Sequence, residues 1–120
     1  MQHIGTDIIE ISRIEEAIER WGDRFLRRVY TTREIELYRK RPASLAARFA
    51  AKEAVMKALD TPNWGIGFRD IEVITGPKGK PIVEIHGPAK KLAGELHVIN
   101  LDVSLSHSRD NAIAVAIVDY

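Results

Sequence analysis

The sequence predicts an α+β fold, in which a largely antiparallel sheet packs against a long buried helix and shorter helices. Helical patterns occupy most of residues 11–59, whereas most strand patterns come later and are joined by short turns, and this order is typical of the α+β class. The length of 120 residues is that of one ordinary domain. We therefore interpret residues 1–120 as a single domain.

Composition excludes several classes of function. The net charge of +1 gives no overall field toward nucleic acid or membrane, so we expect neither as a partner. The absence of cysteine excludes disulfides, thiolate zinc sites and cysteine nucleophiles. No apolar run reaches the roughly 20 residues of a membrane span. The first residues lack the features of a signal peptide, so a cytoplasmic location is expected.

The first part of the chain is predicted to form a strand followed by helices. Residues 3–11 are rich in β-branched side chains, which favours a strand. Residues 12–15, with the sequence Ser-Arg-Ile-Glu, fit a capping box that begins a helix. Gly22 is expected to end that helix, and a second helix follows it. A second capping box at residues 31–34 predicts a short helix that stops before Pro42.

The rest of the chain contains one strongly helical segment and most of the predicted strands. Residues 44–59 form the clearest helix, and residues 69–75 and 81–86 are strands joined by a Gly-rich turn into a hairpin. Pro88 suits the first turn of a helix that runs to about Leu96. The alternating segment 101–106 predicts a half-buried strand, and the apolar segment 112–118 predicts a strand buried on both faces.

The helix at 44–59 carries four charges in apolar surroundings. At 100° per residue, its large apolar residues form one arc and its alanines form the opposite arc, which indicates packing on two sides. Arg48 and Lys52 fall within the large apolar arc, and Glu53 and Lys57 fall on the seam between the arcs. As an i, i+4 pair, Glu53 and Lys57 could simply stabilise the helix by about 0.2–0.5 kcal/mol. Buried charge is costly unless it is paired or metal-bound, so a polar cleft beside this helix is the alternative.

Two further features suggest a site. Asp7 interrupts an apolar strand, and with Glu53 it offers two hard oxygen ligands of the kind that suits Mg²⁺. An isolated Asp can instead mark a strand edge. His107 ends a predicted strand among serine hydroxyls; a surface-turn histidine is the simpler interpretation, and a phosphate pocket is the functional one.

Arginines are frequent near the first two helices. If the helix continued through Gly22, Arg13, Arg20 and Arg24 would project to one side together with the arginines at 27 and 28. Such runs are usually solvated faces. Arginine also binds carboxylates and phosphates well, so an acidic partner is the functional alternative. A net charge near zero argues against an RNA-binding protein.

Taken in order, four segments resemble the bacterial holo-acyl-carrier-protein synthase family, the group I type of 4'-phosphopantetheinyl transferase. The combination of an N-terminal Gly-Thr-Asp, a helical Phe-Ala-Ala-Lys-Glu-Ala and a later Ser-Leu-Ser-His-Ser is specific, and the resemblance spans nearly the whole chain. The segments are GTDIIEISRIE (5–15), RFAAKEAVMKAL (48–59), GIGFRDIEV with GKPIVEIHG (65–73 and 79–87), and VSLSHSRDNAIAVAIV (103–118).

The resemblance implies an activity. Such enzymes transfer phosphopantetheine from coenzyme A to a serine of apo-acyl carrier protein, release 3',5'-ADP, require Mg²⁺ and serve fatty acid biosynthesis. They form homotrimers whose active sites lie between two subunits.

The resemblance also implies roles for matching residues. Asp7 and Glu53 resemble the metal ligands, and Glu53 is a candidate to accept the serine proton. Lys57 would neutralise pyrophosphate oxygens, which makes it catalytic together with the two carboxylates. Residues implied to contact coenzyme A are Arg48, Lys52, Lys57, Thr61 and His107, and those implied to dock the carrier protein are Arg13, Arg20, Arg24 and Phe25.

One segment departs from the family pattern. After residues 57–59 the family usually continues Gly-Thr-Gly, whose backbone can approach phosphate closely, but here the sequence is Asp60-Thr61-Pro62. Pro62 lacks an N–H group and Asp60 would repel phosphate. This change motivates a second hypothesis, a non-catalytic module that binds coenzyme A or carrier protein. Retention of Asp7, Glu53 and Lys57 favours the transferase.

Overall fold

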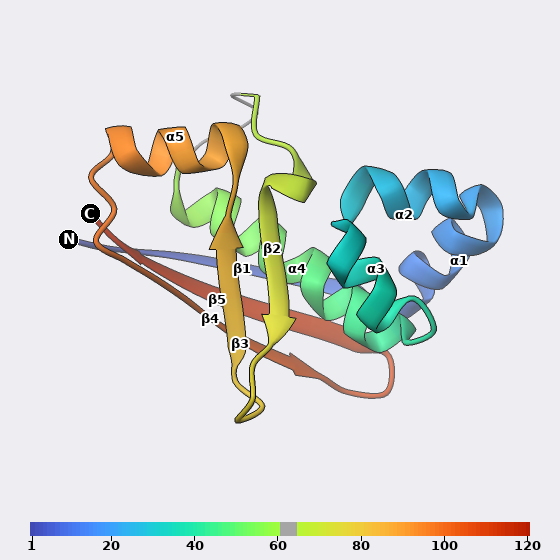
Figure 1. Cartoon of the computed structure of the whole chain (residues 1–120). Helices are drawn as coiled ribbons and strands as arrows, with labels where there is room; N and C mark the ends of the chain where they lie inside the picture. The colour runs from blue at the N-terminus through green and yellow to red at the C-terminus, as the bar shows by residue number, and fades with distance from the viewer. Residues whose placement is uncertain (61–64) are drawn as a thin grey trace.

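The computed structural model describes residues 1–60 and 65–120 of the chain (Figure 1). Helices occupy most of the first half, and four of the five strands follow the long helix α4, as predicted. In chain order the elements are β1 (Gln2–Glu10), α1 (Ile11–Trp21), α2 (Asp23–Val29), α3 (Thr32–Tyr38), α4 (Pro42–Ala58), the short 3₁₀ helix η1 (Phe68–Asp70), β2 (Ile71–Thr75), β3 (Pro81–Ile85), α5 (Gly87–Glu95), β4 (Asn100–His107) and β5 (Asn111–Asp119).

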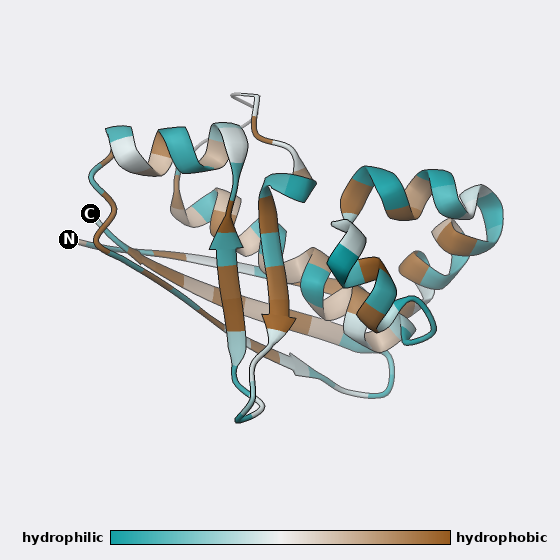
Figure 2. Ribbon diagram, in the orientation of Figure 1, coloured by the Kyte–Doolittle hydropathy of each residue, from teal (hydrophilic) through white to brown (hydrophobic). Residues whose placement is uncertain are grey.

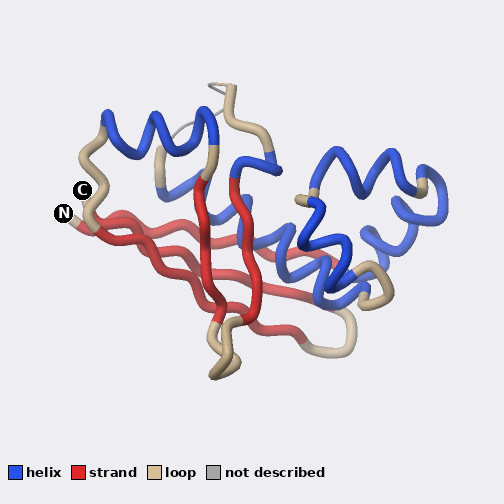
Figure 3. Tube along the Cα trace, in the orientation of Figure 1, coloured by secondary structure: helices blue, strands red, loops and turns tan. Residues whose placement is uncertain are grey.

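The strands form two antiparallel sheets. The larger sheet has the order β1-β5-β4, so the first strand of the chain pairs with the last. The hairpin β2–β3 is a separate sheet that crosses the larger one, and α4 contacts both of them (Figures 1 and 3). The predicted α+β class with a long buried helix is confirmed.

Small side chains allow α4 to lie very close to the larger sheet. A Cβ atom added to Gly5 of β1 would lie 1.9 Å from the carbonyl oxygen of Ala54, so only glycine fits there. The inward positions of β5 are small as well, with Ala112, Ala114 and Ala116 fully buried. The alanine arc of the helix therefore packs on a small-residue strand, as its spacing indicated.

The two predicted capping boxes had different outcomes. The box at residues 31–34 is confirmed, because the Thr31 hydroxyl accepts a hydrogen bond from the Glu34 N–H and the Glu34 carboxylate accepts one from the Thr31 N–H. The box at residues 12–15 is wrong. Strand β1 passes directly into α1, and the N–H of Ile11 donates to the Asp110 carbonyl, so Ser12 already lies inside the first turn.

The start of helix α4 and the burial of strand β5 also differ from the sequence prediction. Helix α4 begins at Pro42, two residues before the predicted start, because proline is well suited to the first turn of a helix. Strand β5 is buried on one face only: Ile113 and Val115 are 40% and 37% exposed. Its sequence is apolar on both faces, but among residues 1–60 and 65–120 no element covers the outer face. In Figure 2, brown marks hydrophobic residues, and brown segments occur on strands of both sheets.

Across residues 1–60 and 65–120, none of the helices combines the length and apolar character that crossing a bilayer requires.

Candidate active site

A cavity of about 340 Å³ opens where β1, α1, α2 and α4 meet. Three charged side chains line it: Asp7 from β1, Arg13 from α1 and Glu53 from α4. The rings of Phe25 and Phe49 contribute to its apolar wall. The fold therefore brings into one cavity the two carboxylates that are far apart in the sequence.

The close approach of β1 to α4 positions Asp7. Alternate residues of β1 face the helix, and Asp7 lies on the same face as Gly5, two residues farther along the strand. There its Oδ1 lies 3.3 Å from the Nζ of Lys57. Lys57 also donates a hydrogen bond of 2.9 Å to the Thr6 carbonyl, so the ammonium group ties the last turn of α4 to the strand.

The surroundings of Glu53 disfavour the negatively charged form of its carboxylate. Partial burial raises its pKa, the negative charge of Asp7 raises it further, and the ammonium group of Lys57 acts in the opposite direction. Within the described part of the chain, no residue donates a hydrogen bond to its carboxylate. Glu53 is therefore a relatively basic carboxylate that is free to take a proton or a cation.

The donor set of the cavity suits a hard divalent cation. Mg²⁺ in proteins is typically held by one or two carboxylates, with water and substrate phosphate completing its coordination. Asp7 and Glu53 supply two such carboxylates. Besides burial, the charge of Asp7 raises the pKa of Glu53, and a cation between the two carboxylates would relieve this repulsion.

Arg48 has a structural place and does not face this cavity. Its guanidinium lies 3.9 Å from the centre of the Tyr38 ring and donates hydrogen bonds to the Thr75 hydroxyl and the Val73 carbonyl. The side chain thus links α4 to α3 and β2. Within one chain its donors are therefore engaged on the hairpin side of the helix, and a contact of Arg48 with coenzyme A stays a prediction.

Lys52 is likewise a core residue. Its side chain is fully buried, and its Nζ lies 2.7 Å from Glu34 Oε1 and within 3.0 Å of the carbonyl oxygens of Phe68 and Ile71. An ammonium group has three N–H donors, so none remains for phosphate. The expectation that Lys52 contacts coenzyme A is corrected for this reason. Burial lowers the pKa of Lys52, and the charge of Glu34 acts in the opposite direction.

Glu34 is the residue that sequence reasoning missed. It is fully buried, and besides binding Lys52 it accepts a hydrogen bond from the Val73 N–H, so one carboxylate joins α3, α4 and β2. The capping box at residues 31–34 identified Glu34 only as a local partner of Thr31. Its distant partners depend on tertiary contacts that no sequence spacing shows.

Two other predicted contacts with coenzyme A lie away from the cavity or outside the described residues. His107 is exposed at the end of β4, and in the sheet its register partner on β5 is Ala112. Since β5 separates β4 from β1, His107 and Asp7 are not neighbours within one chain. Thr61 lies outside the described residues. Asp60, just before it, has a positive φ of 52°, a conformation that glycine adopts more readily.

The predicted docking residues lie on or near the first two helices. Gly22 has a φ of 56° and separates α1 from α2, so the arginines do not form one continuous helical stripe. A second hollow, lined by Trp21, Arg24, Phe25 and Arg28, lies next to the cavity and shares Phe25 with it. The Arg20 guanidinium lies 5.2 Å from the centre of the Trp21 ring.

Comparison with known proteins agrees with this geometry. The family model described as the 4'-phosphopantetheinyl transferase superfamily matches residues 3–117. A holo-[acyl-carrier-protein] synthase from Dehalococcoides mccartyi is 47% identical over 117 residues, which cover 98% of each chain. One from Moorella thermoacetica is 51% identical over 122 residues, covering 99% of this chain and 94% of the relative.

Solved structures share the fold as well. The crystal structure of Helicobacter pylori holo-[acyl-carrier-protein] synthase in complex with coenzyme A gives a TM-score of 0.87 at 35% identity, covering 97% of this chain and 99% of that one. The Neisseria meningitidis enzyme gives 0.88 at 33% identity, covering 98% of both chains. In sequence and in fold, the chain therefore belongs to the 4'-phosphopantetheinyl transferase superfamily, a family of transferase enzymes.

Proposed function

We propose that the chain transfers the 4'-phosphopantetheine group from coenzyme A to a serine hydroxyl of apo-acyl carrier protein and releases 3',5'-ADP. The observation that carries this proposal is the cavity in which Asp7 and Glu53 lie together beside Lys57. The names of the relatives and the coenzyme A complex of a similar structure support it. The modified carrier would serve fatty acid biosynthesis in the cytoplasm.

The reaction requires that pyrophosphate charge be neutralised. Asp7 and Glu53 would hold Mg²⁺, which when bound would offset charge on the pyrophosphate as its P–O bond breaks. Lys57 keeps Asp7 in place through their 3.3 Å ion pair, and its half-exposed ammonium group adds positive charge at the edge of the site. Substrate phosphate can therefore bind next to α4.

Glu53 is the proposed proton acceptor. The serine Oγ forms a bond to the phosphorus that carries the pantetheine arm, the bond from this phosphorus to the 3',5'-ADP oxygen breaks, and the hydroxyl proton moves to the Glu53 carboxylate. A base works best when its pKa is close to the working pH. In the metal-free chain, burial and the charge of Asp7 raise the pKa of Glu53 in that direction, and a bound cation would oppose this rise.

The carrier protein is proposed to dock on α1 and α2. Arg13 lines the cavity itself, and Arg24 and Phe25 line the neighbouring hollow, so a partner bound there would reach the carboxylates. Arg20 lies near the same hollow through its contact with Trp21. Basic side chains beside the exposed ring of Trp21 and the partly buried ring of Phe25 suit a partner with an acidic helix.

We propose that the chain assembles as a homotrimer, with β5 at the interface. The outer face of the larger sheet exposes a row of large apolar side chains, which is unusual for a surface in contact with water. These residues are Ile4, Ile8, Ile113, Val115 and Ile117. Light scattering should give three times the 13.5 kDa of one chain, and Val115→Lys should lower that mass; a wild-type monomer would contradict the assembly.

The alternative function is a module that binds coenzyme A or carrier protein without turnover. Asp60 supports it, because its carboxylate and positive φ stand where the family pattern has glycine. A binding module would have no need of two carboxylates and a lysine converging at one cavity, and this favours the transferase.

Mass spectrometry distinguishes the two functions. Apo-acyl carrier protein is incubated with the chain, coenzyme A and Mg²⁺, beside a known synthase as a positive control. The proposal predicts that the carrier gains the mass of one phosphopantetheine group. If the control enzyme modifies the carrier and this chain does not, the transferase proposal fails and the binding module remains.

A further inference from the structure

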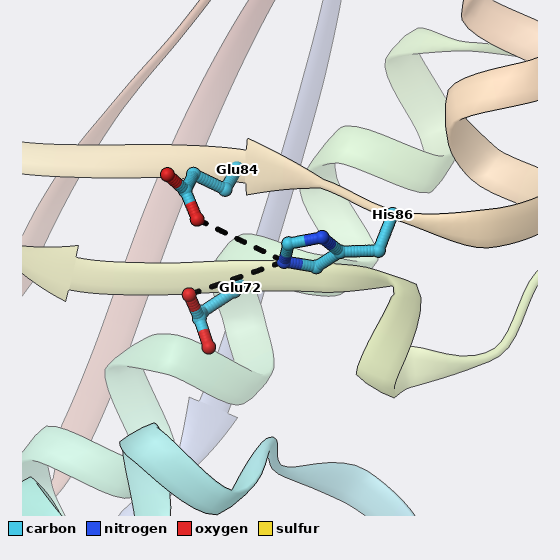
Figure 4. Close-up of side chains that lie close together, drawn as sticks. All are labelled: Glu72, Glu84 and His86. Atoms are coloured by element: carbon cyan, nitrogen blue, oxygen red, sulfur yellow. Dashed lines mark ion pairs between the residues drawn. The ribbon is translucent and has the colours of Figure 1, made fainter.

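A second group of possible metal ligands lies on the β2–β3 hairpin. Glu72, Glu84 and His86 each direct one ligand atom toward a common point, and these atoms all lie within 4.8 Å of one another (Figure 4). His86 Nε2 is 3.9 Å from Glu72 Oε1 and 3.9 Å from Glu84 Oε2. None of the three residues lines the cavity that contains Asp7 and Glu53.

The register of the hairpin places these three side chains together. Glu72 of β2 and Glu84 of β3 are direct partners across the two strands. His86 follows Glu84 by two residues, which returns its side chain to the same face, and its N–H is anchored by a 2.7 Å hydrogen bond to the Asp70 carbonyl. Like charges directly opposite each other destabilise a strand pair, so this arrangement favours a cation between them.

The buried carboxylate provides a second observation that points to a ligand. The Glu72 side chain is only 9% exposed, and its Oε2 accepts a hydrogen bond of 2.6 Å from the Thr31 hydroxyl. Its Oε1, the oxygen that faces His86, accepts no hydrogen bond from any residue in the described part of the chain. The Arg33 guanidinium is 4.0 Å from this oxygen, beyond hydrogen-bond distance, and its side chain is 57% exposed. The carboxylate of this largely buried side chain is thus held in place through Oε2, and its Oε1, which forms a long ion pair with Arg33, faces the cluster.

The ligand set and its spacing indicate which metal fits. An imidazole nitrogen and carboxylate oxygens are both ligand types for Zn²⁺, and water can supply the fourth position of an open site. Zn–ligand bonds of about 2.0–2.2 Å in a tetrahedron place ligand atoms roughly 3.3–3.6 Å apart. The two 3.9 Å separations from His86 would shorten by a few tenths of an ångström, and the carboxylate oxygens, which lie within 4.8 Å of each other, would approach through rotation of the half-exposed Glu84 side chain. We propose that Glu72, Glu84 and His86 form a Zn²⁺ site on the hairpin, separate from the transferase cavity.

The exposure of the ligands defines the character of this site. The side chains of Glu84 and His86 are 54% and 49% exposed, so the ion would exchange directly with solvent. Glu72 belongs to β2, Glu84 belongs to β3, and His86 follows the end of β3. A bound ion would therefore hold β2 against β3. We expect Zn²⁺ to raise the thermal midpoint of unfolding, because a ligand of the native state stabilises it.

Calorimetric titration with Zn²⁺ tests the proposal. The titration is done in a large excess of Mg²⁺, so that Mg²⁺ competes with Zn²⁺ for the two carboxylates of the transferase cavity, Asp7 and Glu53. We expect one Zn²⁺ per chain, and we expect His86→Ala and Glu84→Gln each to weaken binding at least about tenfold. Both residues are half-exposed, so both variants should fold, which circular dichroism checks. A change in the NMR chemical shifts of the His86 ring nitrogens on addition of Zn²⁺ shows directly that His86 is a ligand.

Matched variants make the outcome decisive. His97→Asn and Glu95→Gln remove an exposed imidazole and an exposed carboxylate elsewhere, and neither should alter Zn²⁺ affinity. Glu53→Gln should also leave it unchanged, because that residue belongs to the other cavity. The proposal is overturned if wild-type protein binds no Zn²⁺, if His86→Ala binds as tightly as wild type, or if Glu53→Gln alone abolishes binding.

Discussion

Helix α4 carries two pairs of charges whose surroundings differ sharply. Arg48 and Lys52 are buried and have their hydrogen bonds completed by α3 and the hairpin. Glu53 and Lys57 are less buried and lie beside the cavity and β1. The difference shows that a charge on a buried helix is no sign of chemistry in itself. What distinguishes a site residue is a polar group left free to bind something from outside.

Glu53→Gln should have the largest effect on turnover. The amide keeps the shape of the side chain but accepts no proton and is a weaker cation ligand, so we expect kcat to fall about 10²–10⁴-fold. Carrier modification measured against Mg²⁺ concentration checks this, with Glu36→Gln as an exposed control on α3. Wild-type Mg²⁺ dependence in Glu53→Gln would contradict the assigned role.

Lys52→Met should have the largest effect on stability. It leaves Glu34 buried without its cation, and breaking a buried ion pair in this way costs about 3–5 kcal/mol. Urea denaturation measures the loss, and Lys40→Met, at an exposed position, is the control. Adding Glu34→Gln to Lys52→Met should recover part of the stability. A loss below about 1 kcal/mol in Lys52→Met would show that the pair is not a structural element.

Arg24→Glu should separate docking from chemistry. Arg24 lines the hollow beside the cavity without lining the cavity itself, whereas a carboxylate at Arg13 would stand next to Asp7 and Glu53. We expect the KM for carrier protein to rise roughly tenfold or more, because two like charges then face each other. Steady-state kinetics with Lys78→Glu, on the hairpin turn, provides the control. An increase confined to the KM for coenzyme A would place Arg24 elsewhere.

The pH dependence should reveal the electrostatics of the cavity. Below its pKa Glu53 is protonated and can neither accept a proton nor hold a cation, so activity falls as pH is lowered. Because burial and Asp7 raise this pKa in the metal-free chain, the fall measured at limiting Mg²⁺ should begin at a higher pH than for an ordinary glutamate, and saturating Mg²⁺ should move it to lower pH. In metal-free protein, carboxyl NMR should show that Asp7→Asn lowers the pKa of Glu53 and that Lys57→Met raises it. No response to either variant would mean that these charges do not interact.

Asp60→Gly should have the smallest effect. Glycine adopts the positive φ of this position without a side-chain penalty, although it also gains freedom in the unfolded chain, so the net change in stability should stay within about 1 kcal/mol. Removing the carboxylate should lower the KM for coenzyme A. A raised KM would indicate that Asp60 itself contacts the substrate.

Local sequence signals predicted those parts of the molecule that depend on local contacts. The capping box at Thr31 and the hairpin of β2 and β3 were predictable because neighbouring residues determine them. The box at Ser12 failed because the pairing of β1 with β5 carries the strand directly into α1. The outer face of β5 was misjudged because an apolar strand has the same sequence whether a second sheet or another chain covers it.

The sequence predicted the two carboxylates of the candidate site and Lys57, but it could not separate the other cations of α4 from the site. The seam position of Glu53 and Lys57 follows from helical spacing, and Gly5 with Asp7 gives β1 its place beside α4. Helical spacing could not distinguish Arg48 and Lys52 from site residues, because their partners Thr75 and Glu34 come from other elements. Only tertiary contacts reveal which cationic side chains already have their donors engaged.

The most direct test of the division of charges on α4 compares Glu53→Gln with Lys52→Met in a single-turnover assay. The mass of apo-acyl carrier protein is followed over time and expressed per folded enzyme, as determined from urea denaturation of the same samples. We predict that Glu53→Gln unfolds like wild type yet barely modifies the carrier, while Lys52→Met unfolds at much lower urea yet modifies the carrier close to the wild-type rate per folded chain. Equal loss of turnover in both variants at unchanged stability would contradict the account.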